Sequence, residues 1–597
     1  MHSLSYIRIK NYRACKEVEL PLEGFTPLVG QNNTGKSSIL DAIKWVLKPG
    51  ALAETDFLDA SQPVEVCARI DGISQAIIDL LPEQKHRTAI SPYCNGGRLW
   101  IRASATGTGA KAWKAEVYDF DSYTGTGVPV NWRDYPTGLP QAVSALLPEP
   151  LHIEAMDDIG EDLGKAKAGT TIKALLDEIM APILKTHVAL NEAMTTVRGI
   201  LTAKGANRSE HLKDFDTGVT TALEPFFPGL ALDLDLQIVD IKEFFKAGDL
   251  HVTDKITGDR RKFDQIGTGA QRAIQMALIR YLARVKTADP ATSARRVLLI
   301  DEPELYLHPQ GVRRLRQALF ELSKAGFQVV FSTHSPLMLS RENASDTVIV
   351  GKTKDQGTTA RIPLRAAVQS ALDDAESQSR TLFELGNVAE IYFSERVVLC
   401  EGKTDRRLLP LAYERLFGVA PELHQITFVS MGACSDIPKA MPVLAAMGIK
   451  ACAIVDLDFA FVDARKGNAS LLPKDRADVQ NTKDALKRMQ EVHKFHLGDN
   501  GLPAKDKKSN WQAADTWALW AQDDVGKGIA TSVHDELKTL GIWMWPNGCI
   551  EQVTRYDQKG EDAIIAQEAE LRELDAAELD LKMPEFKKCF DWIKAVN

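Results

Sequence analysis

Apolar and polar residues alternate in several short segments near the start of this chain of 597 residues. Alternation places one side of a β-strand in a core and the other side in solvent. The segments are residues 6–10, 16–22, 63–72, 97–105 and 111–120. Glycine-rich turns separate the later ones, as at Asn95-Gly96-Gly97, so the pattern predicts an antiparallel sheet in the N-terminal part.

A helical period replaces this alternation between about residues 158 and 225. Apolar residues there recur three and four positions apart, at Ile172, Leu175, Leu176, Ile179, Ile183 and Leu184. We predict a helical insertion over 158–225 and regard it as the candidate dimerisation element, with packing inside its own chain as an equal alternative. Strand-like sequence returns at 229–241 and 249–257.

Short runs that are largely apolar throughout predict strands buried on both faces. They are Phe25–Val29, Val297–Ile300, Val329–Phe331, Val397–Cys400, Ile426–Val429 and Ala451–Val455. Helical periods follow most of them, which is the order of elements expected in α/β domains. These changes divide the chain into the N-terminal part of a first domain (1–157), the helical insertion (158–225), the C-terminal part of the first domain (226–350), a linker (351–394) and a second α/β domain with C-terminal helices (395–597).

Composition narrows the cellular setting. The apolar fraction of 44% and the charged fraction of 26% are typical of a globular protein, and the net charge of −9 disfavours wholesale coating of nucleic acid. No run of 18 apolar residues predicts a transmembrane helix, and no secretory leader pattern opens the chain. The eight cysteines are scattered without a C-x-x-C pair. We therefore expect a reduced, cytoplasmic protein without a zinc site or membrane association.

A glycine-bounded loop lies between the first buried run and a helical one. Its residues Gly30-Gln31-Asn32-Asn33-Thr34-Gly35-Lys36-Ser37-Ser38 fit G-x-x-x-x-G-K-[ST]. Glycines let the backbone approach an anion, and the N–H groups of the loop and helix start then face phosphate oxygens. Lys36 would reach the outer phosphates, and the Ser37 hydroxyl would ligate Mg²⁺. The candidate nucleotide-binding residues are Gly30, Asn32, Asn33, Thr34, Gly35, Lys36, Ser37 and Ser38.

Later strand ends carry the chemistry that a bound nucleotide needs. The run Val297–Ile300 ends in two acids: Asp301 is placed to hold Mg²⁺ through water, and Glu302 to orient or deprotonate the attacking water. The next buried run ends near His334, at the edge where α/β sheets place ligand contacts. Before both, Gly267-Thr268-Gly269 opens a long helix whose free N–H groups form another anion-binding end.

Strand ends in the second domain also present acids. Glu401 follows one buried run, and Asp456 and Asp458 follow another, with one βα unit between them. Parallel strands end at one edge of their sheet, and residues two apart on an extended segment point the same way. We therefore expect several carboxylates within a few ångströms of one another. Such carboxylates repel, and oxygen-preferring divalent cations resolve the conflict, activate water and stabilise a phosphodiester during transfer.

The motifs of the first domain resemble, in this order, the head of an ABC-type ATPase, in the branch shared by SMC-like, RecF-like and overcoming-lysogenisation-defect (OLD) proteins. Ile7–Arg13, Asp301–Pro309 and Ser332–Pro336 carry the likeness. By this resemblance Gly267-Thr268-Gly269 stands at the signature motif, where Thr268 would replace the usual serine. The resemblance implies that Thr268, Gly269, Asp301 and His334 complete the ATP site. Heads of this class enclose ATP between two copies, so a homodimer or higher homo-oligomer is implied.

The acids of the second domain resemble those of a Toprim domain, in Glu401-Gly402-Lys403-Thr404-Asp405 and Asp456-Leu457-Asp458. Gly548 to Glu551 resembles the downstream acid of the OLD branch, and Lys559 is a candidate counterpart of its late lysine. The metal ligands implied are Glu401, Asp405, Asp456, Asp458 and Glu551. We therefore expect an α/β protein in which an ABC-type ATPase head, with mixed sheets and a helical insertion, precedes a Rossmann-like Toprim domain.

An ABC-type head followed by a Toprim domain is the arrangement of OLD nucleases, including Gabija-type antiphage nucleases. The resemblance implies an ATP-regulated, metal-dependent endonuclease that cleaves DNA in antiphage defence, with the catalytic residues Glu302, Glu401, Asp456, Asp458 and Lys559. ATP and Mg²⁺ are the expected cofactors, with Mn²⁺ as an alternative at the Toprim site, and an accessory defence protein is a candidate partner. Two alternatives remain: a Toprim effector that cuts RNA such as tRNA, and a RecF-like or SMC-like repair ATPase whose Toprim domain does not cut.

Overall fold

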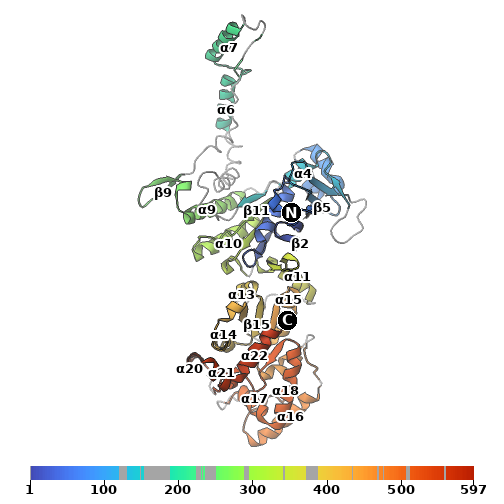
Figure 1. The fold of residues 1–597 in the computed structure, drawn as a ribbon, viewed down its shortest axis with the longest axis vertical. Coiled ribbons are helices and arrows are strands. Elements are labelled where there is room, and N and C mark those ends of the chain that lie inside the picture. Colours follow the sequence, from blue (N-terminus) through green and yellow to red (C-terminus); the bar gives the residue numbers. More distant parts are fainter. Residues whose placement is uncertain are drawn as a thin grey trace. The chain divides into compact units, whose positions relative to one another are not determined.

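The structure, a computed structural model, describes residues 2–81, 83–119, 131–147, 150–153, 188–223, 230, 233–234, 251–287, 295–340, 343–371, 388–432, 434–466, 470–474, 476–505, 511–556 and 560–596. Two compact units form: the first contains Met1–Ile7, Leu22–Phe25 and Ile39–Thr333, and the second contains Arg8–Pro21, Thr26–Ser38 and His334–Asn597. Element labels follow Figure 1.

An antiparallel ladder occupies the N-terminal part of the first unit. Its strands pair in the order β4 (Val64–Asp71), β5 (Leu99–Ala105), β6 (Trp113–Tyr118) and β7 (Trp132–Asp134). Ala68 faces Ile101, which faces Val117, so apolar side chains meet across the ladder. This confirms the strands predicted at 63–72, 97–105 and 111–120. The helices of this part are α2 (Gln75–Asp79), α3 (Gln84–Ile90) and α4 (Leu139–Leu146).

A parallel ladder of buried strands forms the other part of the first unit. β11 (Arg296–Ile300) lies between β8 (Leu151–Ile153) and β12 (Phe327–Thr333) and is parallel to both. All of β12 is buried, which confirms the burial predicted for Val329–Phe331 and extends it to the polar residues Gln328, Ser332 and Thr333. The helices α9 (Thr268–Thr287) and α10 (Pro309–Lys324) pack against each other, and α10 also packs against β12.

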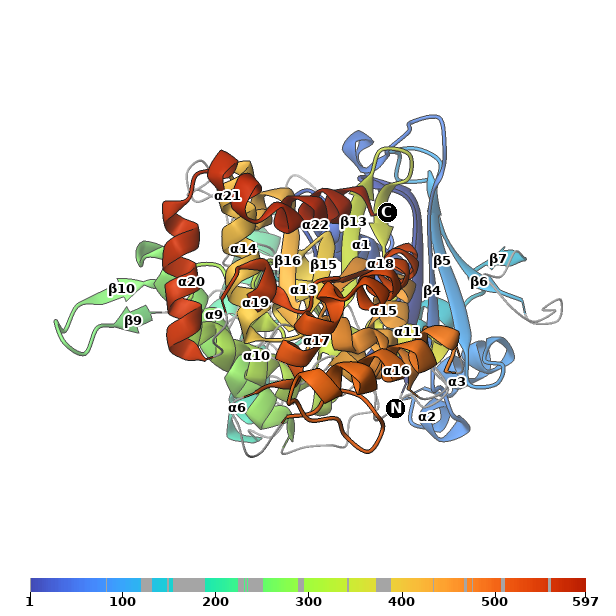
Figure 2. The ribbon, with the colours of Figure 1, turned by 90° about the horizontal axis from the view of Figure 1, so that it is seen from below.

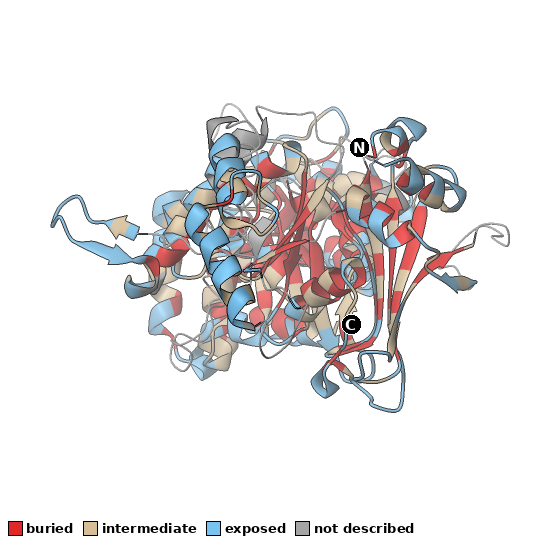
Figure 3. Cartoon of the chain, turned by 90° about the horizontal axis from the view of Figure 1, so that it is seen from above, coloured by how far each residue is buried: buried red, intermediate tan, exposed pale blue. Residues whose placement is uncertain are grey.

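The described part of the predicted insertion is helical. It comprises α6 (Val188–Leu201) and α7 (Glu210–Leu223), whereas the repeat from Ile172 to Leu184 lies outside the described residues. Of the strands predicted next, 229–241 lies mostly outside the described residues. The second appears as β9 (His251–Thr253), which pairs antiparallel with β10 (Arg260–Lys262) in a largely exposed hairpin (Figure 3).

Strands of the predicted head also belong to the second unit. β2 (Cys15–Pro21), β14 (Gly357–Ala360), β13 (Val348–Thr353) and β3 (Phe25–Val29) pair in that order, with β13 parallel to β3. Together with β1 (Ser3–Tyr12), β2 confirms the two strands predicted at the start of the chain. The segment predicted as a linker holds β14, α11 (Leu364–Ala371) and α13 (Val388–Phe393).

The second predicted α/β domain contains a parallel sheet of four strands among the described residues. Their order is β16 (Ile426–Ser430), β15 (Arg396–Cys400), β17 (Lys450–Val455) and β18 (Ile542–Met544). α14 (Lys403–Phe417) packs on β16 and α15 (Ile437–Ala446) on β17 (Figure 2). Along β15, Val397 and Leu399 join one hydrophobic cluster and Val398 and Cys400 another, so each face of the sheet has its own core.

Helices account for most of the remaining chain. Between β17 and β18 lie α16 (Ala477–Val492), α17 (Ala513–Gln522) and α18 (Asp524–Thr539). After β18 come α19 (Ile550–Val553), α20 (Glu561–Glu573), α21 (Ala576–Lys582) and α22 (Pro584–Ala595). Arg407 of α14 forms a two-pronged ion pair with Glu568 and so holds α20 against α14. No helix in the described part of the chain is long and apolar enough to cross a membrane.

Candidate nucleotide and metal sites

The glycine-bounded loop lies between β3 and α1 (Lys36–Leu47), as predicted. Lys36 is buried, and its Nζ donates to the carbonyl oxygens of Gly30 (3.1 Å) and Gln31 (2.8 Å). Thr34 Oγ1 donates to the same Gln31 oxygen at 2.9 Å. The loop therefore curls over the lysine ammonium group, a charge that phosphate oxygens would also attract.

Two glycines make this curl sterically feasible. A Cβ on Gly30, where φ is +156°, would lie 2.0 Å from the Val350 carbonyl oxygen. A Cβ on Gly35, where φ is +101°, would lie 2.2 Å from Thr358 Oγ1. Both positions thus exclude a side chain by contact as well as by conformation. Between them, Asn32 and Asn33 are exposed, as is Ser37 at the start of α1.

The predicted acids of the first unit are held by hydroxyl groups at the end of β12. Ser332 Oγ donates to Asp301 Oδ1 in a short hydrogen bond, and it accepts a bond of 2.9 Å from the Glu302 N–H. Thr333 Oγ1 donates to Glu304 Oε1 at 2.6 Å. Glu302 adopts a φ of +44°, a left-handed conformation that is strained for a residue with a side chain. The turn after β11 is therefore rigidly specified.

The other residues predicted to contact ATP fall at element boundaries. α9 begins at Thr268, with Gly269 in its first turn, as expected for a helix start at the signature position. His334 directly follows β12. His334 and the glycine-bounded loop of residues 30–38, called the phosphate loop below, belong to the second unit. Asp301, Glu302 and α9 belong to the first. Their roles in ATP binding stay predictions.

The acids of the second domain gather at the carboxyl end of the parallel sheet, as the sequence predicts. Glu401 follows β15, Asp456 follows β17, and Glu551 lies in α19 after β18. Asp405 lies in the first turn of α14, where its Oδ2 accepts a hydrogen bond of 3.1 Å from the Gly402 N–H. Lys559, the candidate lysine, lies outside the described residues.

The expected geometry of the Asp456-Leu457-Asp458 segment is wrong. Asp456 ends the extended backbone, whereas Asp458 lies inside a 3-10 helix spanning Leu457–Ala460, so the two side chains do not share a strand face. The chain turns because Leu457 is buried and its N–H donates to the Gly548 carbonyl oxygen at 2.7 Å. This bond also joins the Asp458 turn to the segment that carries Glu551.

Burial and mutual repulsion dominate the electrostatics of these acids. Burial, reinforced by the Glu401 and Glu551 carboxylates, raises the pKa of Asp405 to about 7. Burial, reinforced by all four neighbouring acids, raises the pKa of Asp456 well above its usual range. Oε2 of Glu401 is buried without a hydrogen-bond partner among the described residues.

The acids stand farther apart than the sequence suggests. Among the described residues, no three His, Cys, Asp or Glu side chains lie close enough together to hold one metal ion. Like charges disfavour closer approach of these side chains, and a divalent cation between them would offset that repulsion. The donor set nevertheless consists of carboxylate oxygens, the ligands that Mg²⁺ and Mn²⁺ prefer.

Two further residues, one in each unit, have no part in the sequence-based prediction. Cys434 begins the turn after β16, and burial together with the Glu401 carboxylate raises the pKa of its thiol far above its usual value. Its position after a third parallel strand end is the signal that could have found it. Arg272 is completely buried in α9 beside the Asp301 turn. The sequence signal that could have found Arg272 is a positively charged residue within the apolar helical repeat of α9.

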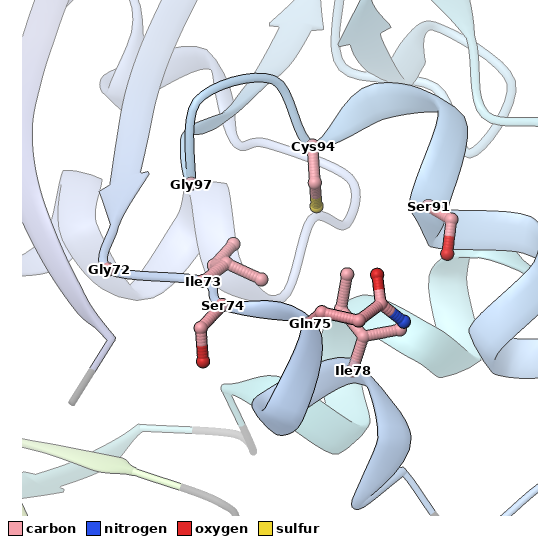
Figure 4. A pocket seen from close by; sticks show the side chains of 8 residues that line it. All are labelled: Gly72, Ile73, Ser74, Gln75, Ile78, Ser91, Cys94 and Gly97. Carbon is pink, nitrogen blue, oxygen red and sulfur yellow. The ribbon is translucent and has the colours of Figure 1, made fainter.

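A cavity of about 410 Å³ in the first unit contains none of the predicted site residues (Figure 4). Its lining is uncharged and comprises Gly72, Ile73, Ser74, Gln75, Ile78, Ser91, Cys94 and Gly97. A polyphosphate or a divalent cation would find no charged partner in this lining.

Comparisons with known proteins show what the two parts of the chain are similar to. The AAA ATPase domain family matches residues 3–85 and 161–339, and the overcoming lysogenization defect protein-like TOPRIM domain family matches residues 392–458. The Old nuclease of Escherichia phage P2 is 32% identical over 566 residues, which cover 93% of this chain and 93% of that protein. The chain belongs to the OLD nuclease family.

More distant OLD relatives span less of the chain. The OLD nuclease of Thermus scotoductus is 23% identical over 77% of this chain and 83% of that protein, and Endonuclease GajA of Bacillus cereus is 22% identical over 68% and 66%. The Smc head domain of Pyrococcus furiosus aligns with a TM-score of 0.35 at 16% identity, over 62% of this chain and 98% of that one. Family membership and the two domain matches confirm the predicted architecture, an ABC-type ATPase head followed by a Toprim domain, and the enzyme class, a nuclease with an ATPase head.

Proposed function

We propose that this OLD nuclease hydrolyses DNA at its Toprim acids with a divalent cation, under the control of ATP in the head. The observation that carries the proposal is the gathering of acids at one sheet edge, where the pKa values of Asp405 and Asp456 are raised. Acids whose pKa values are raised in this way are stabilised most by a bound cation, because it lets them ionise together.

The acids Glu401, Asp456 and Asp458 would hold the cation, with Asp405 and Glu551 completing the set. A divalent cation held there would supply the activation of water and the stabilisation of the negative charge that develops on a phosphodiester. Hydrogen bonds within the chain hold these acids in place. The Gly402 N–H orients the Asp405 carboxylate, and the hydrogen bond from Leu457 to Gly548 links the Asp458 turn to the start of α19. The N-terminus of α14 adds a partial positive charge beside Glu401.

A cleavage assay tests the reaction and its substrate. Plasmid DNA and a tRNA are incubated separately with the purified protein, with Mg²⁺, Mn²⁺ or a chelator. Asp456→Asn is compared with Asp535→Asn, which removes an exposed acid of α18. We expect DNA cleavage that needs the metal, is lost in Asp456→Asn and is kept in the control. Cleavage by folded Asp456→Asn would refute the site. Cleavage of tRNA alone would favour the RNA alternative, and cleavage of neither polymer would favour a Toprim domain that does not cut.

Contacts inside the second unit support control by ATP. In the amide orientation that its neighbours require, Gln425 Oε1 accepts a hydrogen bond of 2.6 Å from Gln31 Nε2, and Gln425 Nε2 donates to both carboxylate oxygens of Glu395 (2.7 and 2.8 Å). The Gln425 carbonyl oxygen accepts from the N–H groups of Glu395 and Arg396, at the start of β15. A chain of hydrogen bonds thus runs from the phosphate loop to the start of β15, the strand that Glu401 follows.

Apolar packing accompanies this chain of hydrogen bonds. Val29 and Ile349 of the head strands share one hydrophobic cluster with Val397 and Leu399 of β15. The buried Tyr392 of α13 donates its hydroxyl hydrogen to the Ala344 carbonyl oxygen. Because dense packing transmits displacement, both features support coupling between the nucleotide loop and the Toprim sheet.

Cleavage measured over a range of ATP concentrations tests this control. Lys36→Ala removes the cation of the phosphate loop, and Lys85→Ala removes an exposed lysine of α3 as a control. We expect ATP to change the cleavage rate of the wild type and of Lys85→Ala but not that of Lys36→Ala. Identical ATP profiles for Lys36→Ala and the wild type would contradict the control by ATP.

We further propose that the protein acts as a homodimer and restricts phage. Exposed apolar side chains on the described insertion helices support association, since Val197 of α6 and Phe215 of α7 are 40% and 47% exposed. Light scattering at several protein concentrations tests whether the protein is a dimer, and a monomer at all of them contradicts the proposal.

Plaque counts on cells that express the wild type or Asp456→Asn test whether the protein restricts phage. Equal counts would argue against defence.

A further inference from the structure

Arg272 occupies a position that is unusual for a cation. It lies in the second turn of α9, is completely buried and is not one of the residues assigned above to ATP or metal binding. A guanidinium group keeps its charge when buried, so it must be surrounded by hydrogen-bond acceptors. Its partners therefore reveal what the residue does.

The partners of Arg272 are the successive carbonyl oxygens of the turn after β11. Nη2 donates to the Asp301 carbonyl oxygen (3.1 Å) and to that of Glu302 (2.7 Å), and Nε donates to that of Pro303 (3.3 Å). Nη1 donates to Gln275 Oε1 at 3.2 Å, one turn farther along α9. One planar group thus collects three consecutive backbone oxygens, a pattern that lysine cannot reproduce.

The turn held in this way has a strained backbone. Glu302 has a φ of +44°, and Tyr306, three residues after Pro303, has a φ of +63°. Strained residues persist when the surrounding contacts over-determine them. Arg272 supplies those contacts on the carbonyl side of the turn, and Ser332 supplies one on the N–H side.

The same helical turn also holds the loop before α9. Gln271, the neighbour of Arg272, donates from Nε2 to the carbonyl oxygens of Phe263 and Ile266, each at 3.0 Å. Two consecutive residues of α9 therefore hold two different segments. Gln271 holds the loop before the helix, and Arg272 holds the Asp301–Pro303 turn. A shift of the helix start would move both together.

We propose that Arg272 is a positioning residue for ATP hydrolysis, which holds the Asp301–Pro303 turn so that the Glu302 carboxylate faces the attacking water, and which ties that turn to the start of α9. The inference rests on the proposed ATP chemistry of the head. Arg272 itself touches neither nucleotide nor water in this role.

The first experiment compares Arg272→Lys with Arg314→Lys, which alters an exposed arginine of α10. Steady-state ATP hydrolysis gives kcat and KM, and a fluorescent ATP analogue gives the binding affinity. We expect kcat of Arg272→Lys to fall by about 10–100-fold, because a misplaced catalytic group costs up to this much, while the affinity changes by less than about threefold. A kcat equal to that of the control overturns the proposal.

The second experiment asks whether Arg272 acts through Glu302. Glu302→Gln and the double variant Arg272→Lys/Glu302→Gln are compared in single-turnover assays. If Arg272 serves only to place the Glu302 carboxylate, the double variant is no slower than Glu302→Gln alone. Losses that multiply overturn the proposal, because they would mean that Arg272 supports the fold independently.

A third variant covers the case in which Arg272→Lys does not fold, as judged by its thermal unfolding. Gln275→Ala keeps the arginine but removes its fourth partner, and we expect a smaller fall in kcat that again does not add to Glu302→Gln. An active Glu302→Gln would refute the role of Glu302 and with it the proposed ATP chemistry. An inactive Glu302→Gln with full activity in Arg272→Lys and Gln275→Ala would refute the role of Arg272 alone.

Discussion

The head and the Toprim domain handle charge in opposite ways. In the head, backbone carbonyls surround the cations: Lys36 Nζ contacts two carbonyl oxygens of its loop, and Arg272 contacts three of a turn. In the Toprim domain, acids face other acids, and the pKa values of Asp405 and Asp456 rise. The cations of the head are thus held by backbone carbonyl oxygens, whereas the acids of the Toprim edge would be stabilised by an added positive charge.

The largest effect expected from this contrast concerns Glu401→Gln. It removes one negative charge from the Toprim edge while keeping the shape of the side chain. We expect cleavage to fall on the order of 10²–10³-fold, the loss seen when one electrostatic group of an active site is removed. We also expect the melting temperature to rise, because repulsion is relieved. Initial cleavage rates and thermal unfolding measure the two effects.

The matched control is Glu414→Gln, an exposed acid of α14. It should leave both the cleavage rate and the melting temperature unchanged. A Glu401→Gln protein that melts lower than the wild type would mean that Glu401 stabilises the fold, and the contrast between the two regions would then be false.

Alanine at Gly30 or Gly35 tests the other half of the contrast. The added Cβ would lie 2.0 Å from Val350 O or 2.2 Å from Thr358 Oγ1, so the loop must shift. We expect ATP binding to weaken by at least tenfold and the free energy of unfolding to fall by about 1–3 kcal/mol. Calorimetry and denaturant unfolding measure these changes.

Gly218→Ala is the control for the glycine variants. It lies in α7 with open space around the new methyl group, so it should stabilise the protein by about 0.5–1 kcal/mol without affecting ATP binding. Unchanged ATP binding in Gly30→Ala would show that backbone shape is not what makes the nucleotide site.

The same contrast explains which features the sequence could predict. The phosphate loop and the buried strands are local patterns, so their bounds match the structure closely. The shared edge of Glu401, Asp456 and Glu551 also follows from strand order. The 3-10 turn at Asp458 does not, because it depends on a hydrogen bond to Gly548, ninety residues away. The role of Arg272 could not be assigned either, since the three oxygens that it holds in the Asp301–Pro303 turn belong to the backbone and carry no residue-type signal.

A smaller effect concerns pH. The pKa of Asp405 is about 7 in the fold, above its ordinary value of 3.8. Below pH 3.8 Asp405 is protonated in both the folded and the unfolded chain, so it does not change the free energy of unfolding. Between about pH 4 and 7 it ionises in the unfolded chain alone, so stability falls as pH rises through this window. We expect Asp405→Asn to flatten this dependence of the melting temperature.

Added metal sharpens the pH prediction. Mg²⁺ at millimolar concentration should raise the melting temperature by several degrees at pH 8 and by much less at pH 5, because the acids bind it best when ionised. The rise at pH 8 should shrink in Asp405→Asn. An equal rise at both pH values would mean that Mg²⁺ acts elsewhere on the protein.

The smallest effect lies in the link between the two regions. Gln31 and Gln425 form a single hydrogen bond of 2.6 Å, so removing either partner should change ATP binding only slightly. A double-mutant cycle of Gln31→Ala and Gln425→Ala isolates the pair, and we expect a coupling free energy of about 0.5–1 kcal/mol. The control is a second double-mutant cycle of Gln31→Ala with Gln480→Ala, which changes an exposed residue of α16. We expect no coupling free energy in that cycle. If the Gln425 cycle is also additive within error, the hydrogen bond carries no signal. The head and the Toprim domain would then have to communicate through the packing of Tyr392 and Val397, or not within one chain at all.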